Sequence, residues 1–175
     1  CHAESIPVIP IAGPCAVTAA LSVAGIPTDR FSFEGFVPSK QKARSDFYQR
    51  LANESRTLVF FEAPHRIEIS LDDLEKIVGG HRQLAICREL TKVFEQVVRG
   101  SIADLRRAVV TGEIGSKGEF VLVLARAKQT FNSDIDRLLT ALLPDLPPSK
   151  AAAIAARLTA APKSILYRRA LQLKT

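Results

Sequence analysis

Apolar runs of strand length alternate with helical segments along the first 125 residues of this sequence. Strands are predicted at residues 30–37, 57–61, 84–87, 94–98 and 120–124. Helical segments of about 10 to 15 residues separate most of these strands. Such an alternation predicts an α/β fold, in which helices cover the faces of a sheet.

Helical periodicity and end signals define the other elements. Helices are predicted at residues 13–24, 39–52, 64–78, 101–109, 133–143, 149–158 and 164–173. Pro64 begins the third of these helices and Gly79 ends it, while Ser101 is the predicted N-cap of the fourth. Every predicted element after residue 133 is helical, so the sheet is expected to end with the strand at 120–124.

The first residues predict a strand close to the start of the chain. Ile6–Ile11 is apolar, and Pro7 and Pro10 within it confine such a strand to the edge of a sheet. The sequence contains no methionine, and this apolar run follows soon after Cys1. We therefore expect the chain to begin inside a fold. The predicted domains are residues 1–28, as the last strand and helix of a preceding domain, 29–128, as an α/β domain, and 133–175, as a helical tail.

Basic residues are concentrated at the C-terminal end of the chain. The net charge is +6, and residues 150–175 carry six of the 24 basic residues and no acidic residue. The remaining 18 basic residues balance the 18 acidic ones, so the whole excess of positive charge lies in this tail. A basic, acid-free tail on a neutral body indicates a polyanionic partner.

Composition and residue spacing exclude several classes of protein. No apolar run approaches the roughly 20 residues of a membrane-spanning helix, and no secretory signal is visible. The three cysteines are far apart and odd in number, which argues against a disulfide framework and favours reduced thiols in a cytoplasm. The three histidines are scattered without metal-ligand spacing. We therefore expect a cytoplasmic protein with neither a membrane partner nor a metal cofactor.

Charged residues lie at the ends of three of the predicted strands. The segments are Glu34–Lys40, Glu62–Arg66 and Arg88–Lys92. Open α/β sheets place ligands at the carboxyl ends of their strands, and charges beside buried strands need partners. The start of the helix after Glu62 also offers free N–H groups to an anion. We therefore expect the three clusters to converge on one edge of the sheet and to form a ligand site there.

Each cluster taken alone also has a purely structural interpretation. Glu34 and Lys40 fit a turn with a surface ion pair, and Glu62 and Arg66 fit an ion pair with each other. Histidine is the usual base near neutral pH, yet His65 also fits an ordinary residue of the first helical turn. The functional interpretation therefore depends on the convergence of the clusters and not on any one of them.

Five motifs occur in order along nearly the whole chain. They are AGPCA at residues 12–16, EGFVPSK at 34–40, FEAPHR at 61–66, RELTK at 88–92 followed by Glu95, and KGEFVLV at 117–123. Together they resemble the RsmI-type small-subunit ribosomal RNA methyltransferases of the tetrapyrrole-methylase-like superfamily. The resemblance is specific because five separate motifs match in register.

The resemblance implies the C-terminal α/β domain of a tetrapyrrole methylase, with a mixed sheet, followed by a small helix-turn-helix-like tail. It implies methyl transfer from S-adenosylmethionine to the ribose 2′-hydroxyl of a cytidine in small-subunit ribosomal RNA, as free RNA or in the assembled small subunit. It also implies a homodimer with the cofactor between two domains. The glycine-rich cofactor loop of such enzymes has no counterpart in this sequence, so we expect the chain by itself to be inactive.

The chemistry of methyl transfer and the motifs together suggest site residues. A ribose hydroxyl is a poor nucleophile until a positioned base shares its proton, and such a base contributes about 10²- to 10⁴-fold. A lysine serves as a base only where burial or neighbouring cations lower its pKa. The catalytic candidates are Glu34, Lys40, Glu62, Arg88, Glu89 and Lys92, with Glu119 as a further carboxylate. The candidates for cofactor contact are Gly13, Pro14, Cys15, Ala63, Leu90 and Thr91. The candidates for RNA contact are Arg66, Lys117, Lys150, Lys163, Tyr167, Arg168 and Arg169.

Two other functions fit parts of the sequence. A methylase of a corrinoid or porphyrinoid tetrapyrrole shares the fold, but it needs no acid-free basic helical pair. A non-catalytic nucleic-acid-binding module explains the basic tail, but it needs no carboxylates near an anionic ligand. The tail itself fits a helix-turn-helix in contact with RNA, or an alanine-rich hairpin that packs on the body or on a second copy.

Overall fold

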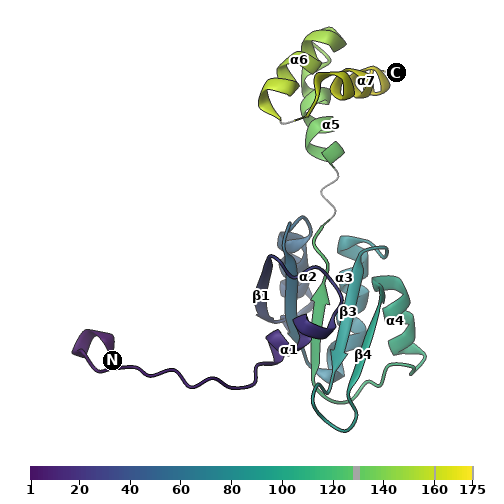
Figure 1. The fold of residues 1–175 in the computed structure, drawn as a ribbon. Coiled ribbons are helices and arrows are strands. Elements are labelled where there is room, and N and C mark those ends of the chain that lie inside the picture. The colour runs from purple at the N-terminus through teal and green to yellow at the C-terminus, as the bar shows by residue number, and fades with distance from the viewer. Residues whose placement is uncertain (128–130, 160, 175) are drawn as a thin grey trace. The chain divides into compact units, whose positions relative to one another are not determined.

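The computed structural model describes residues 1–127, 131–159 and 161–174, and the chain divides into two compact units (Figure 1). Unit 1 comprises Cys1–Ala127 and contains the sheet, whereas unit 2 comprises Lys128–Thr175 and is helical in its described part. The α/β class with a helical tail is as predicted. The assignment of residues 1–28 to a preceding domain stays a prediction.

Unit 1 is built on a five-stranded mixed sheet in the order β1-β2-β5-β3-β4. The strands are β1 (Phe31–Phe36), β2 (Thr57–Glu62), β3 (Gln83–Arg88), β4 (Gln96–Ser101) and β5 (Phe120–Leu124). β1 and β2 are parallel, β5 is antiparallel to both β2 and β3, and β4 is antiparallel to β3. β1, β2 and β3 therefore end at one edge of the sheet, where β5 begins; we call this the carboxyl edge.

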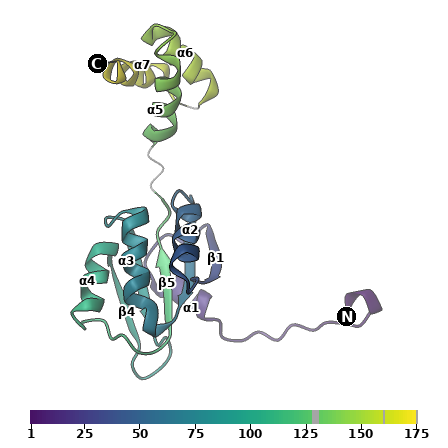
Figure 2. The ribbon, with the colours of Figure 1, turned by 180° about the vertical axis from the view of Figure 1, so that it is seen from behind.

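Helices pack on both faces of the sheet. Helices α2 (Gln41–Leu51), α3 (Ile67–Val78) and α4 (Ile102–Val110) cover one face, and α1 (Ala16–Val23) lies on the other (Figure 1 and Figure 2). Because side chains alternate along a strand, each face buries its own set. The face under α2, α3 and α4 buries Leu58, Phe60, Leu84, Ile86, Leu122 and Leu124. The face under α1 buries Val59, Ala85, Cys87, Val121 and Val123.

Caps and turns end the helices of unit 1 as the sequence predicts. Ser101 Oγ accepts the Asp104 N–H at 3.1 Å, which confirms Ser101 as the N-cap of α4. Helix α3 ends where Gly79 adopts a φ of +86°, a region that favours glycine. The helix predicted from Pro64 begins as a short 3-10 turn, η2 (Pro64–Arg66), before α3.

The predicted strand at Ile6–Ile11 is wrong. This segment has no regular structure after the short 3-10 turn η1 (His2–Glu4), and Ile9 and Ile11 are 82% and 94% exposed. Pro7 and Pro10 lack N–H donors for a ladder, and no strand among the described residues lies beside the segment. Apolar side chains without a paired neighbour do not form a strand by themselves.

The strand predicted at residues 94–98 is displaced along the chain. It is observed as β4, which begins at Gln96 and runs to Ser101. Phe94 stays in the preceding turn, where its carbonyl accepts Arg88 Nη1 at 3.1 Å. That side-chain contact depends on tertiary structure, so it was not visible in the local pattern.

Unit 2 consists of α5 (Phe131–Leu142), α6 (Pro148–Leu158) and α7 (Lys163–Leu173) in its described part. Their contact is rich in small side chains, because the buried core comprises Ile135, Leu139, Ala151, Ala152, Ala155, Ala161, Leu166 and Ala170. An ion pair ties α7 to α5: Arg169 Nε and Nη2 donate to the Asp136 carboxylate at 2.7 and 2.5 Å. The predicted helix-turn-helix-like tail is confirmed as a helical unit.

Membrane-spanning helices and groups of metal ligands are not found among the described residues. None of the helices there is long and apolar enough to cross a membrane. No group of three or more potential metal ligands gathers among the described residues. Cys1, Cys15 and Cys87 are all free thiols.

Candidate active site at the carboxyl edge of the sheet

Two of the three predicted clusters meet directly at the carboxyl edge. Glu62 at the end of β2 and Arg88 at the end of β3 both pair with Phe120, the first residue of β5, from its two sides. β1 ends beside them, because Phe36 pairs with Phe61. The strand ends therefore converge as the sequence predicts.

The cluster of β1 is not joined to the other two. Glu34 lies inside the strand, and its carboxylate accepts the Ser32 hydroxyl at 2.5 Å, farther from the carboxyl edge. Lys40 is exposed at the start of α2. Among the described residues, neither side chain has an ion pair with the other or with the clusters of β2 and β3.

Glu62 and Arg66 form an ion pair, the structural interpretation that the sequence left open. Glu62 is 2% exposed, its Oε1 accepts the Ala63 N–H at 2.7 Å, and it lies 3.1 Å from Arg66 Nη2. The helix start that was expected to attract an external anion therefore already holds a carboxylate of the chain itself.

A buried polar layer that was not predicted from the sequence lies between α2 and α3 in the same core. Tyr48 Oη and Ser70 Oγ are 2.7 Å apart, and Arg44 Nε donates to Asp73 Oδ2 at 2.7 Å. Burial is the main reason why the pKa of Tyr48 is raised, and the charge of Glu62 adds to it. The available signal was the helical spacing of Arg44 with the apolar residues of α2, which places a charge on a core face.

Arg88 holds two loops of the carboxyl edge together. Its Nε donates to the Lys117 carbonyl at 2.5 Å and its Nη1 to the Phe94 carbonyl at 3.1 Å. The loop from α4 to β5 is also close, since a Cβ on Gly115 would lie 3.0 Å from Arg88 Cζ. The guanidinium of this catalytic candidate is thus committed to backbone carbonyls, and Lys117 contributes its carbonyl while its side chain is exposed.

Glu89, Lys92 and Glu119 form a three-membered charge cluster. Glu89 Oε1 accepts the Glu119 N–H at 2.8 Å and Lys92 Nζ at 2.9 Å, and Lys92 Nζ lies 3.0 Å from Glu119 Oε2. The Glu119 N–H, and then Lys92, lower the pKa of Glu89. Hydrogen bonds to Glu89 and Glu119 raise the pKa of Lys92. Lys92 is therefore held as a cation and does not meet the condition for a lysine base.

The loop after β3 contains two non-glycine residues in the left-handed region. Glu89 has a φ of +50° and Thr91 a φ of +64°. The Thr91 N–H donates to Glu95 Oε2 at 2.6 Å, which holds this conformation in place. Such conformations cost about 1–3 kcal/mol each and gather at functional sites. The strain therefore points to the same edge as the charges do.

The residues proposed for cofactor contact differ in how far they are exposed to solvent. Gly13 and Pro14 are exposed in the chain before α1, and Cys15 is the N-cap residue of that helix. The backbone N–H of Thr18 is the main reason why the pKa of the Cys15 thiol is lowered. Two further candidates, Ala63 and Leu90, are half-buried at the carboxyl edge, and a third, Thr91, is exposed there.

Gly118 leaves room for the charge cluster because it has no side chain, a role that was not predicted from the sequence. Its φ is +97°, and an added Cβ would lie 2.5 Å from Glu89 Cγ. The only sequence signal was its place within the motif at residues 117–123.

We expect Gly118→Ala to lower the free energy of unfolding by more than about 1 kcal/mol, because both the backbone conformation and the contact with Glu89 oppose a methyl group. Gly112 has a φ of +81° with nothing within 4 Å, so Gly112→Ala isolates the backbone effect; Gly13→Ala has neither penalty. Urea unfolding of the three variants measures the series. A Gly118→Ala variant as stable as Gly13→Ala would contradict this packing.

The basic tail presents most of its candidate RNA-binding residues to solvent. Lys150, Lys163 and Arg168 are exposed, and Tyr167 is 42% exposed. Arg169 differs from them, because its guanidinium is engaged by Asp136 as described above. Its position gives it a structural role within unit 2.

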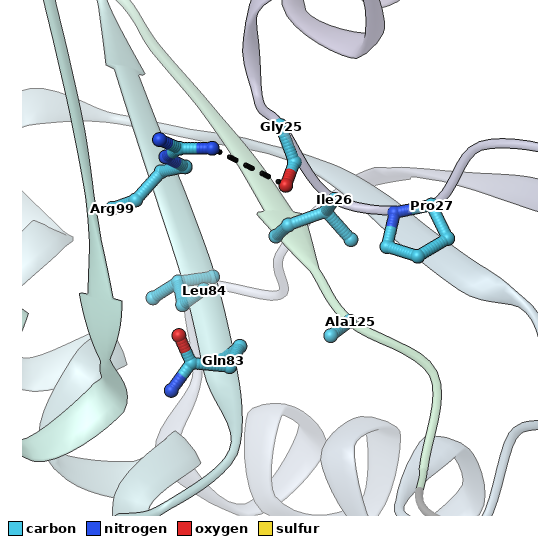
Figure 3. Close-up of a pocket in the computed structure, with 7 residues that line it drawn as sticks. All are labelled: Gly25, Ile26, Pro27, Gln83, Leu84, Arg99 and Ala125. Atoms are coloured by element: carbon cyan, nitrogen blue, oxygen red, sulfur yellow. Dashed lines mark hydrogen bonds between the residues drawn. The ribbon is translucent and has the colours of Figure 1, made fainter.

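A separate pocket lies at the opposite edge of the sheet (Figure 3). It has a volume of about 400 Å³ and is lined by Gly25, Ile26, Pro27, Gln83, Leu84, Arg99 and Ala125. Arg99 Nη1 reaches the Gly25 carbonyl at 3.4 Å. Its lining contains no carboxylate and none of the candidate residues, so the pocket does not belong to the candidate active site.

Two family models match the chain in sequence order. The model described as Tetrapyrrole (Corrin/Porphyrin) Methylases matches residues 1–106, and the model described as RsmI C-terminal HTH domain matches residues 129–174. The solved structure of a cobalamin biosynthetic enzyme, cobalt precorrin-4 methyltransferase, is similar with a TM-score of 0.50 and 17% identity. That likeness covers 71% of this chain and 54% of the other, and it concerns the fold alone.

Curated relatives are similar over nearly the whole chain. The Ribosomal RNA small subunit methyltransferase I of Xylella fastidiosa (strain Temecula1) is 48% identical over 169 residues, which are 95% of this chain and 62% of that protein. The protein of the same name from Pseudomonas aeruginosa is 42% identical over 176 residues, which are 98% and 62%. The chain thus spans about 62% of the length of these relatives.

Proposed function

We propose that this chain forms part of an enzyme that methylates small-subunit ribosomal RNA. The chain belongs to the tetrapyrrole methylase family and, within it, to the RsmI-type methyltransferases. The proposed reaction transfers a methyl group from S-adenosylmethionine to the ribose 2′-hydroxyl of a cytidine, in free RNA or in the assembled small subunit. The observation that carries the proposal is the meeting of the β2 and β3 clusters at the carboxyl edge, in a chain that also bears a basic helical unit.

The groups at the carboxyl edge suit an adenosyl amino acid that carries a sulfonium. Carboxylates there match its positive charges, cations match its carboxylate, and the half-buried Ala63 and Leu90 offer apolar contact. When bound, S-adenosylmethionine supplies the electrophilic methyl group. The proposed contacts are Gly13, Pro14, Cys15, Ala63, Leu90 and Thr91.

Glu89 is the residue that we propose as an electrostatic partner of this positive charge. Among the described residues, the hydrogen bonds that Lys92 and the Glu119 N–H donate to this carboxylate both go to Oε1 and not to Oε2. Its lowered pKa keeps it ionised, which suits charge stabilisation better than proton removal. Arg88 and Lys92 hold the surrounding loops. The acceptor of the hydroxyl proton is sought among Glu34, Lys40 and Glu62.

The basic unit distinguishes this function from the two alternatives. We propose that Lys117, Lys150, Lys163, Tyr167 and Arg168 contact RNA, together with Arg66 at the carboxyl edge. A corrinoid or porphyrinoid methylase has no use for such a unit, and a passive RNA-binding module has no use for the strained carboxylate cluster. We further propose a cytoplasmic homodimer.

The expected result of Glu89→Gln is a fall of at least about 10²-fold in kcat, because a charge that acts at the transition state is lost. The protein is expressed from its full reading frame, and transfer of a labelled methyl group to small ribosomal subunits is measured. Asp46→Asn, an exposed carboxylate on α2, is the matched control and is expected to keep wild-type activity. Methylation of a tetrapyrrole but not of RNA by the wild type would reject the proposal.

A further inference from the structure

Glu62 is directed away from solvent. Along β2 it follows Leu58 and Phe60 at two-residue spacing, and these side chains lie in the core under α2 and α3. Its side chain is 1% exposed, and its Oε1 already serves the Ala63 N–H and Arg66. A general base must reach the proton that it removes, directly or through one water molecule. Glu62 is therefore poorly placed to act on a substrate itself.

The ion pair between Glu62 and Arg66 contains two unsatisfied atoms. Glu62 Oε2 and Arg66 Nε are both buried, and neither has a hydrogen-bond partner in the described part of the chain. Both atoms belong to the same pair, and the charge of Glu62 also acts on the buried Tyr48 hydroxyl, whose pKa is raised mainly by burial. Leaving such groups unpaired costs about 1–3 kcal/mol each or more. A pair kept under this cost points to a task that a neutral, apolar contact would not perform.

Arg66 is the member of this pair that reaches the solvent. Its side chain is 16% exposed, and Nη2 is the atom near Glu62. Nη1 has no partner among the described residues and is not one of the buried unsatisfied atoms. The planar guanidinium is thus held on one side while its other side remains available at the carboxyl edge. A fixed guanidinium matches the geometry of phosphate and carboxylate groups.

We infer that Arg66 is a preorganised receptor for an oxyanion at the carboxyl edge, and that Glu62 is a positioning residue that acts through Arg66. The inference rests on the proposed function and removes Glu62 from the candidate proton acceptors. The oxyanion is either a phosphate of the RNA or the carboxylate of the methyl donor. Both present paired oxygens to an arginine.

The test compares Glu62→Gln, Arg66→Lys and the double variant in the protein expressed from its full reading frame. We expect Glu62→Gln to keep the rising limb of the pH profile of kcat/KM at its wild-type position. Each single variant is expected to raise KM for one substrate about tenfold, as the loss of a charge-assisted hydrogen bond implies. The double variant should be no worse than the poorer single one, because both act through one contact. Arg50→Lys, on the exposed surface of α2, is the matched control.

Two binding measurements identify the source of the oxyanion. Calorimetry measures the affinity of Arg66→Lys for S-adenosylmethionine, and filter binding measures its affinity for small ribosomal subunits. Loss in either arm supports the inference, whereas affinities within twofold of wild type in both arms overturn it. Loss of the rising pH limb in Glu62→Gln, or multiplication of the two single effects in the double variant, also overturns it.

The proposed function and this inference fail in distinguishable ways. A wild-type protein that methylates no RNA defeats the proposed function, while the binding arms with Arg66→Lys still decide the role of Arg66. Thermal unfolding of each variant shows whether it is folded. If Glu62→Gln does not fold, Arg66→Lys, which keeps the charge but not the planar fork, carries the test alone.

Discussion

Asp73→Ala is expected to lower the free energy of unfolding of unit 1 by about 3–5 kcal/mol, because it leaves the Arg44 guanidinium buried without its counter-charge. The side chains of Arg44 and Asp73 are 4% and 10% exposed, and their Nε and Oδ2 atoms are 2.7 Å apart. Among the described residues, the bond that Arg44 would then keep is the one from Nη1 to the Ser39 carbonyl at 3.1 Å. For a unit of this size the loss corresponds to a fall in Tm of about 10–20 °C. Urea and thermal unfolding of the 175-residue chain measure it.

The double variant Arg44→Met/Asp73→Leu is the informative control for this pair. Replacing both members of a buried ion pair by apolar residues of similar volume is often neutral or stabilising. We therefore expect the double variant to regain most of the stability lost in Asp73→Ala. A loss below about 1 kcal/mol in the single variant would show that the pair is hydrated and contributes no more than a surface ion pair.

Lys163→Gln/Arg168→Gln is expected to weaken binding to small-subunit ribosomal RNA by about 10- to 50-fold near 0.1 M salt. Each lost phosphate contact removes about 0.7–0.9 from the slope of log affinity against log salt, so two contacts should reduce that slope by roughly 1.4–1.8. Both side chains are exposed on unit 2, and residues 150–175 contain no acidic residue. Filter binding over a series of salt concentrations gives affinity and slope together.

A charge-matched variant separates a specific surface from the effect of net charge. Lys42 and Arg50 are exposed on α2 of unit 1, and Lys42→Gln/Arg50→Gln removes the same two charges. We expect it to leave the slope nearly unchanged. Equal slopes for the two double variants would mean that RNA binding depends only on the net charge of the protein. The proposed role of the helical unit in RNA contact would then be wrong.

The sequence predicts those parts of the fold that depend on local pattern. Helical spacing and end residues such as Ser101 and Gly79 placed the helices within a few residues of their observed bounds. Charged residues after two apolar runs predicted where β2 and β3 end, whereas Glu34 lies inside β1 and does not follow it. β2 and β3 run in the same direction and therefore end at the same edge of the sheet. The Glu62 and Arg88 clusters meet there for this reason.

Features that depend on distant partners were not predictable. The strand expected at Ile6–Ile11 needed a neighbouring strand, which a local pattern does not supply. Lys92 is held as a cation by Glu89 and by Glu119. Glu119 is 27 residues away and reaches Lys92 because β5 lies beside β3. The pairing of Arg169 with Asp136 likewise depends on how α7 packs on α5. Charge type and spacing could identify these residues but not their partners.

The place of β5 in the sheet affects how the chain is able to fold during its synthesis. β5 is the last strand in the sequence, yet it lies at the centre, between β2 and β3. Until the ribosome has released residue 124, the nascent chain can form only two separate strand pairs, β1 with β2 and β3 with β4. The inner edges of both pairs are then open, and such edges promote aggregation. Elongation through the segment from β4 to β5 is therefore the interval in which a chaperone would matter most.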